Sequence, residues 1–180
     1  MTVNLEATSA DQATTDWSEL RERIRTWATE LGFSDLGIAD IDLADIEPRL
    51  QQWLDEGRHG AMDWMARHGS KRTRPAELVP GTVRVVSVTM DYWPPDSEHA
   101  RRVLRDPARG YVSRYALGRD YHKVMRNRLQ KLARRIEREV GDFGYRAFVD
   151  SAPVMEKPLA HKAGLGTQGK HTCLIDRERG

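Results

Sequence analysis

Residues 16–31 carry apolar side chains at intervals of three and four, which is the spacing of one face of an α-helix. Asp16 and Glu19 resemble a capping pair at the start of this segment, and Gly32 is well placed to end it. The apolar face consists of Leu20, Ile24, Trp27, Ala28 and Leu31. The pattern predicts an amphipathic helix that begins near Asp16.

A longer apolar stripe occupies residues 118–141, and it predicts the clearest helix of the chain. Its members are Tyr121, Met125, Leu129, Leu132, Ile136 and Val140. Arginines and a lysine mostly lie off this stripe. Further helices are expected at 46–57, with Pro48 in the first turn, at 61–69, and at 154–164.

Apolar and β-branched residues cluster in short runs between these helices. The segment 83–93, "VRVVSVTMDYW", is the clearest strand signal, and 35–40 reads as a short buried strand. Two more strands are expected at 145–150, ending at Asp150, and at 171–176. Residues 71–82 read as a connection and 96–112 as a long, polar, basic loop. Because helices and strands alternate, we expect an α/β or α+β domain.

Length and composition fit one folded domain. The chain has 180 residues, of which we expect 1–16 to be a disordered tail and 17–180 to form the domain. No apolar run approaches the roughly 20 residues that span a bilayer, and the polar start does not resemble a secretory signal. The single cysteine, Cys173, fits a reducing cytoplasm and excludes an internal disulfide.

The net charge of +2 conceals an uneven distribution. Residues 1–60 contain 5 Lys and Arg against 13 Asp and Glu, whereas residues 101–138 contain 13 against 3. A local excess of this size attracts polyanions such as RNA. A solvated helix face rich in arginine explains it equally well.

Asp150 is the first candidate for chemistry, because it follows an expected strand and ligands of α/β folds collect at the carboxyl ends of strands. A carboxyl group in an apolar pocket holds a proton at neutral pH and acts as a general acid. The alternative is an aspartate that caps a turn, and position alone favours that alternative.

A glycine cluster follows, formed by Gly164, Gly166 and Gly169. It superficially resembles a dinucleotide fingerprint but lacks the preceding strand and the following helix. Two readings remain open: the end of a helix with a tight turn, or backbone that closely approaches a large flat ligand. The six histidines show no metal-ligand spacing, one cysteine cannot ligate an iron–sulfur cluster, and no serine has a hydrolase context.

Four long motifs resemble the epoxyqueuosine reductases in order and spacing. They are "GAMDWMARH", "KRTRPAELVPGTVRVVSVTMDYWP", "SRYALGRDYHKVMRNRL" and "FVDSAPVMEKPLAHKAGLGTQGKH". The resemblance covers nearly the whole chain after about residue 17. It implies a cobalamin-binding, nitroreductase-like domain, followed in the family by a ferredoxin-like domain with two [4Fe-4S] clusters.

The same resemblance implies a function and a set of site residues. The family reduces epoxyqueuosine to queuosine at the wobble position of tRNA, the last step of queuosine biosynthesis, and Asp150 takes the role of proton donor. The family's cobalamin contacts fall on Arg72, Ser113, Asp150, Lys170, His171 and Leu174. No protein metal ligand is implied in this chain. The expected partners are tRNA with queuosine-type anticodons and an external electron donor, with no membrane and a monomeric state.

The chain ends at Gly180, before the cysteines that would hold the family's clusters. We therefore expect a cobalamin domain truncated before the ferredoxin-like domain. Two alternatives stay open: an inactive fragment that binds cobalamin or tRNA, and a flavin-dependent relative of the nitroreductases.

Overall fold

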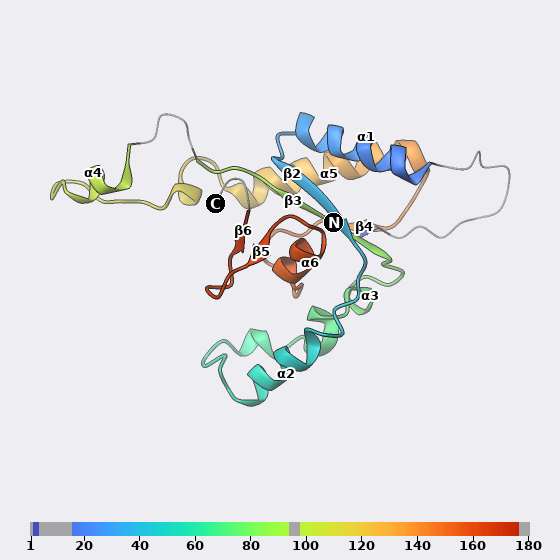
Figure 1. Ribbon diagram of the computed structural model, residues 1–180, viewed down its shortest axis with the longest axis horizontal. Helices are drawn as coiled ribbons and strands as arrows, with labels where there is room; N and C mark the ends of the chain where they lie inside the picture. The colour runs from blue at the N-terminus through green and yellow to red at the C-terminus, as the bar shows by residue number, and fades with distance from the viewer. Residues whose placement is uncertain (1, 4–15, 94–97, 177–180) are drawn as a thin grey trace.

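The computed structural model describes residues 2–3, 16–93 and 98–176 as a mixed helix and strand domain (Figure 1). The α-helices are α1 Trp17–Glu30, α2 Glu47–Asp55, α3 Pro75–Leu78, α4 Ala100–Leu104, α5 Tyr121–Val140 and α6 Glu156–Lys162. Short 3₁₀ helices are η1 Asp63–Met65, η2 Gly69–Arg72 and η3 Arg114–Ala116. The strands are β1 Thr2–Val3, β2 Asp35–Ala39, β3 Arg84–Thr89, β4 Tyr145–Arg146, β5 Thr167–Gln168 and β6 Leu174–Ile175.

The main sheet has the strand order β2-β3-β1-β4, and every pairing in it is antiparallel. Its longest ladder joins β2 to β3, with Leu36 opposite Val88 and Ile38 opposite Val86. A separate hairpin pairs β5 with β6. Because no pairing among the described strands is parallel, the fold is α+β.

Alternate residues of β3 enter two different apolar clusters, as the period of two in a strand requires. Val86 belongs to the larger cluster, which it shares with α1 and α5, whereas Val85 packs with Leu43 and Leu159. Figure 1 accordingly shows α1 and α5 on one side of β2 and β3, and α6 on the other. The larger cluster is formed by Leu20, Ile24, Ala28, Phe33, Leu36, Val86, Leu129, Leu132, Ala133, Ile136, Phe143 and Val149.

Helices α1 and α5 form as the sequence predicts, and polar contacts join them along one side. Asp16 caps α1 by accepting hydrogen bonds from the backbone of Ser18 and Glu19. Ion pairs link Arg23 to Glu139 and Arg135 to Glu30 between the two helices. In addition, Arg128 Nη1 donates to the Gly32 carbonyl at 2.8 Å and also contacts the sulfur of Met90.

Several segments differ from the sequence-based prediction. The helix expected at 61–69 is only the 3₁₀ turn η1, and the expected connection 71–82 contains α3. The loop expected at 96–112 contains α4, although residues 94–97 lie outside the described residues. The strand expected at 145–150 ends at Arg146, so Asp150 lies in a bend beyond β4 and not at a strand end.

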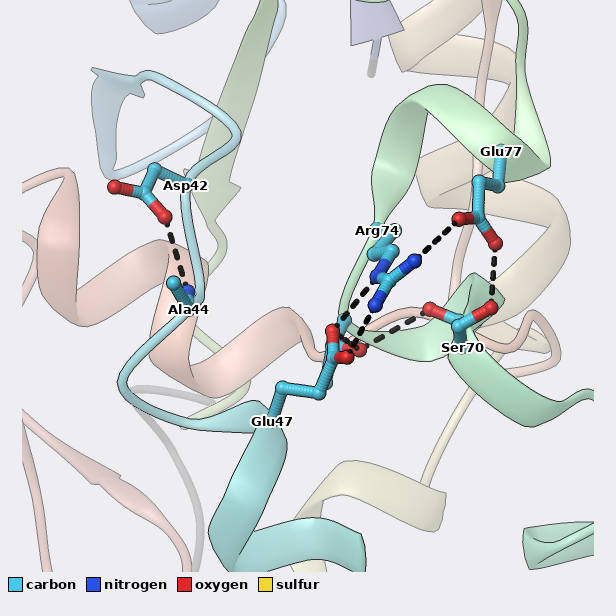
Figure 2. Close-up of polar contacts among 7 residues, drawn as sticks. Asp42, Ala44, Glu47, Ser70, Arg74 and Glu77 are labelled. Carbon is cyan, nitrogen blue, oxygen red and sulfur yellow. Dashed lines mark hydrogen bonds and ion pairs between the residues drawn. The ribbon is translucent and has the colours of Figure 1, made fainter.

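A polar network fixes α2 against the segment that carries η2 and α3 (Figure 2). Arg74 Nη2 donates to Glu47 Oε1 at 2.6 Å, and Arg74 Nη1 donates to Glu77 Oε1 at 3.0 Å. Thr73 Oγ1 donates to Glu47 Oε2 at 2.8 Å, while Ser70 bonds to Glu77. The hydrogen bonds from Arg74 and then Thr73 lower the pKa of Glu47. The network therefore holds the backbone on either side of Arg72.

Most of the tail expected at 1–16 lies outside the described residues, so its disorder stays a prediction. Within the part that the structure describes, residues 2–3 form β1 between β3 and β4. No helix in the described ranges has the length and apolarity needed to cross a membrane.

Candidate active site

Asp150 lies where the start of α5 meets the start of α6. The Tyr121 hydroxyl, in the first turn of α5, donates a hydrogen bond to Asp150 Oδ2. This bond, together with partial burial, raises the pKa of Tyr121 to about 12, so the phenol stays a donor at neutral pH. Asp150 itself adopts a positive φ of 55°, a conformation that aspartate tolerates better than most residues.

A second contact reaches Asp150 from the same turn of α5. His122 Nε2 lies 3.4 Å from Asp150 Oδ2, and His122 Nδ1 lies 3.1 Å from Asp120 Oδ1. Asp120 is also the N-cap of α5, since it accepts a hydrogen bond from the His122 backbone. The Tyr121 and His122 rings stack with centroids 4.1 Å apart. Histidine, aspartate and tyrosine thus form one connected polar group at the helix start.

Glu156, the first residue of α6, holds the backbone of Asp150. Its Oε1 accepts a hydrogen bond from the Asp150 N–H at 3.1 Å. Burial, and then the neighbouring charge of Asp150, raise the pKa of Glu156. Glu156 is a second carboxyl group beside Asp150, and the sequence analysis did not select it. Its signal in the sequence was an acid at the start of a helix, six residues after Asp150.

The polar group opens onto a cavity of about 200 Å³. Asp150, Tyr121 and Glu156 line it together with apolar residues of β3, α5 and α6, including Val86, Val88, Met125, Leu129 and Leu159. The Asp150 side chain is 53% exposed, so it lies at the rim of the cavity. An acid at the rim of an apolar cavity can transfer a proton to a group held there.

Arg72 is buried and bonded within the chain. It is the last residue of η2. Its Nε donates to the Met65 carbonyl at 3.0 Å, and its Nη2 donates to the Trp64 carbonyl at 2.9 Å. Burial lowers the pKa of its guanidinium. Its carbonyl accepts a hydrogen bond from the Met155 N–H at 3.2 Å, which connects η2 to the start of α6. Arg72 therefore shapes the loop at 64–65.

Ser113 is exposed and is the N-cap residue of η3. The same short helix carries Tyr115, whose ring meets the Tyr121 ring edge-on at 6.2 Å between centroids. Arg114 lies over the rings of Trp93 and Tyr111, with its Cζ 5.3 and 5.6 Å from their centroids. Aromatic contact thus places the Ser113 segment next to the group around Asp150.

Lys170 and His171 are exposed at the tip of the β5–β6 hairpin, and Leu174 is half-buried in β6. The glycines before and within this hairpin are explained by the chain itself. A Cβ on Gly166 would lie 2.5 Å from the Ile175 carbonyl oxygen, and one on Gly169 would lie 2.8 Å from the His171 ring. Gly164 ends α6 with a φ of +82°. The turn reading of the glycine cluster accounts for all of these positions.

Among the described residues, the structure joins Asp150 to side chains outside the sequence-predicted site set. Asp150 gathers Tyr121, His122 and Glu156, none of which was selected in advance. By contrast, the contacts of the described residues do not join Arg72, Ser113 or the hairpin tip directly to the Asp150 side chain. In the described ranges, no three His, Cys, Asp or Glu side chains gather as a metal-binding set would.

A family model described as "Epoxyqueuosine reductase QueG, DUF1730" matches residues 72–151. The match begins at Arg72 and includes Ser113, Tyr121, His122 and Asp150. It therefore covers both α5 and the bend that carries Asp150.

Curated relatives match over most of the chain. The epoxyqueuosine reductase of Xanthomonas campestris is 61% identical over 172 residues, covering 96% of this chain and 48% of the relative. That of Vibrio cholerae is 59% identical over 165 residues, covering 92% of this chain and 44% of the relative. The chain thus spans a little less than half the length of these relatives.

Two solved structures share the fold. The epoxyqueuosine reductase of Streptococcus thermophilus matches with a TM-score of 0.72 and 26% identity, over 89% of this chain and 42% of that one. An epoxyqueuosine reductase with an epoxyqueuosine-modified tRNA-Tyr stem loop matches with a TM-score of 0.70 and 22% identity. The match covers 91% of this chain and 43% of that one.

The family model, the curated relatives and the solved structures that this α+β domain matches all describe reductases. Over 92–96% of its length the chain is similar to the N-terminal portion of curated epoxyqueuosine reductases. The family resemblance carried by the four sequence motifs is thereby confirmed.

Proposed function

We propose that this chain is the substrate-reducing part of an enzyme that converts epoxyqueuosine to queuosine in tRNA. The observation that carries the proposal is the group around Asp150, which places one acid, two supporting donors and a second carboxyl group at the rim of a cavity. The reductases to which the chain is 59–61% identical support the choice of reaction.

In this proposal Asp150 is the proton donor. Reductive opening of an epoxide breaks a C–O bond and leaves negative charge on the oxygen, and a positioned acid removes that cost. Tyr121 donates to Asp150 Oδ2 and so holds the carboxyl group in place for proton transfer. The bond from the Asp150 N–H to Glu156 fixes the backbone that carries the carboxyl group.

His122 is suited to return the proton to Asp150 after each turnover. With its Nδ1 proton directed to Asp120, the ring presents Nε2 to Asp150. The ring is therefore in position to relay a proton between Asp120 and Asp150. Asp120, His122 and Asp150 then form a short proton path from the surface to the cavity rim.

We infer that the reducing cofactor is cobalamin, as the family resemblance implies, with [4Fe-4S] clusters held outside this chain. Bound cobalamin would supply the electrons for epoxide reduction. Ser113, Lys170, His171 and Leu174 fit a contact role, since they are exposed or half-buried. Arg72 would act through the 64–65 loop, because its Nε and Nη2 are already bonded there. The domain that binds the cofactor would span 17–180.

The proposed substrate partner is tRNA, and the electrons would come from an external donor. A solved structure of the same fold carries an epoxyqueuosine-modified tRNA stem loop, which supports RNA as the partner. We place the reaction in the cytoplasm, in keeping with the single cysteine of the chain, and propose that the enzyme is a monomer.

The decisive experiment measures reduction of epoxyqueuosine-containing tRNA by the gene product that contains this chain, with cobalamin and a chemical reductant. Asp150→Asn should lower kcat by about 10²- to 10⁴-fold, the usual contribution of a general acid. The matched change Asp45→Asn, at an exposed aspartate outside the site, should leave kcat unchanged. Full activity of Asp150→Asn would refute the acid role, and no reduction by the wild type would refute the proposed reaction.

A separate binding measurement tests the cofactor. The visible spectrum of cobalamin should change when the purified 180-residue chain is added. Ser113→Ala and Lys170→Ala should each weaken this binding. An unchanged spectrum would count against cobalamin, and a yellow protein as purified would favour the flavin alternative.

A further inference from the structure

The outer face of α5 carries a row of basic side chains that the site around Asp150 does not use. Helix α5 runs from Tyr121 to Val140, and its buried residues Leu129, Leu132, Ala133 and Ile136 face the core. The exposed basic residues are Lys123, Arg126, Lys131, Arg134 and Arg138. At 100° per residue, four of them fall on the side opposite the core and Arg126 lies at the edge of that side, all within a sector of about 140°. We call these five residues the α5 basic row.

The acids of the neighbouring helix do not neutralise this row. Glu30 of α1 pairs with Arg135, and Arg23 of α1 pairs with Glu139. Arg135 and Glu139 lie on the side of α5 that faces α1. Arg128 is likewise turned to that side, where it donates to Gly32. Among the ion pairs of the described residues, none includes a member of the α5 basic row. The row therefore keeps an excess of positive charge, with half-buried Glu137 as the acid on the same turns.

We propose that the α5 basic row binds the phosphate backbone of an RNA duplex. From Lys123 to Arg138 the row extends about 22 Å along the helix axis, at 1.5 Å per residue. The exposed amides of Asn127 and Gln130 lie between the basic residues. Such amides add hydrogen bonds to phosphate and sugar oxygens. Charge in this arrangement fixes the position of an RNA without reading its sequence.

The face lacks what a membrane surface would require. An interfacial helix presents large apolar side chains beside its basic ones. The exposed large apolar residues of the described chain include none between 118 and 140. A membrane partner is therefore disfavoured against RNA.

The position of the row connects it with the proposed active site. Lys123 follows directly after Tyr121 and His122, which contact Asp150. An RNA stem lying along α5 would consequently end near the cavity rim, where a single nucleotide can reach Asp150. The choice of RNA as the polyanion rests on the proposed function, whereas the charge of the face does not.

Binding of a fluorescently labelled RNA hairpin to the 180-residue chain, followed by anisotropy at 50–200 mM salt, tests the proposal. The triple change Lys131→Glu, Arg134→Glu and Arg138→Glu should weaken binding at least tenfold and reduce the salt slope by about 2–3, close to one per phosphate contact. The control triple Arg49→Glu, Arg67→Glu and Lys71→Glu makes the same change of charge on exposed residues near α2, on the other side of the sheet (Figure 1). It should change binding by less than twofold.

Equal loss of binding in both triples would overturn the proposal, because it would show an effect of net charge alone. Loss of binding to anionic phosphatidylserine vesicles without loss of RNA binding would also overturn it. Circular dichroism confirms folding, and a triple with glutamine at the same positions replaces the glutamate triple if that variant unfolds. A failed reduction assay with intact, row-dependent RNA binding would refute the proposed reaction and leave this surface standing.

Discussion

Tyr121 donates its phenolic hydrogen to the Asp150 carboxylate, and this bond joins the first turn of α5 to the bend before α6. The same tyrosine stacks on His122 and meets Tyr115 edge-on. Tyr121 is therefore a positioning residue for the proposed acid, and it holds the carboxyl group from the side of α5.

Tyr121→Phe removes this hydrogen bond and keeps the ring contacts. We expect kcat to fall about ten- to a hundredfold with little change in KM, because a hydrogen bond to a charged group contributes about 1.5–3 kcal/mol. Steady-state kinetics of tRNA reduction measure the effect. An increase in KM alone would instead assign Tyr121 to substrate binding.

The raised pKa of Tyr121 gives a second, independent readout. The folded pKa of about 12 lies above the ordinary value of about 10, so the stabilising bond is fully present below pH 10 and is lost as the pH rises through 12. The difference in absorbance at 295 nm between wild type and Tyr121→Phe should therefore reach its midpoint near pH 12. In Asp150→Asn the midpoint should move down toward 10, and a wild-type midpoint already at 10 would contradict the bond.

Glu156→Gln should affect stability in a pH-dependent way. Burial and the charge of Asp150 raise the pKa of Glu156, so its neutral form is favoured in the folded chain. Below the unfolded pKa of about 4.3 the wild type and the glutamine variant carry the same charge here. As the pH rises through the folded pKa, the wild type alone acquires a buried charge and loses stability. Urea unfolding should show that the stability of the variant relative to wild type is higher at pH 7 than at pH 4.

The control for this prediction is Asp150→Asn, which removes the second cause of the shift. In that background the gain from Glu156→Gln between pH 4 and pH 7 should be smaller. If the stability of Glu156→Gln relative to wild type instead falls with rising pH, the raised pKa of Glu156 is contradicted.

Gly37→Ala should destabilise the fold by about 1–3 kcal/mol, the usual cost of overpacking. A Cβ on Gly37 would lie 2.4 Å from the Ala163 carbonyl oxygen and 2.8 Å from the Ala163 Cβ, where β2 passes the end of α6. Gly110→Ala is the matched control, since a Cβ there meets nothing within 4 Å, and we expect a change below about 0.5 kcal/mol. Urea denaturation of both variants measures the difference.

Arg72→Lys should be destabilising even though it keeps the charge. A lysine cannot replace the two planar donors that reach the carbonyls of Met65 and Trp64, and a carbonyl left without a donor costs about 1–3 kcal/mol. The melting temperature should fall by about 2–4 °C for each kcal/mol. Arg74→Lys, at an exposed ion pair, should lower the melting temperature less than Arg72→Lys does. Equal melting temperatures for both variants would show that Arg72 is not needed for the fold.

Local patterns in the sequence predicted α1 and α5 well. Both have an apolar stripe over several turns and an aspartate as N-cap, Asp16 for α1 and Asp120 for α5, so their start and their buried face follow from neighbouring residues. Helix α4 was missed because its five residues, of which only Val103 is buried, are too short to show a period.

The strand expected up to Asp150 was wrong for a non-local reason. A strand needs a partner along its length, and β4 pairs only with the two residues of β1. The Tyr121 and Glu156 contacts of Asp150 were missed for a similar reason, since the first joins side chains 29 positions apart. The sequence motifs selected Asp150 as the proposed acid, whereas its environment depends on how α5 and α6 pack against the sheet.

The positive φ of Asp150 gives the site a particular vulnerability. A bend of this kind has no regular ladder to hold it, so its shape depends on Tyr121 from α5 and Glu156 from α6. If the short helix α6 frays while the rest of the domain stays folded, the acid loses one of these two anchors. Catalysis would then fail by local opening well before the protein unfolds, and storage conditions that preserve the global fold would not by themselves preserve activity.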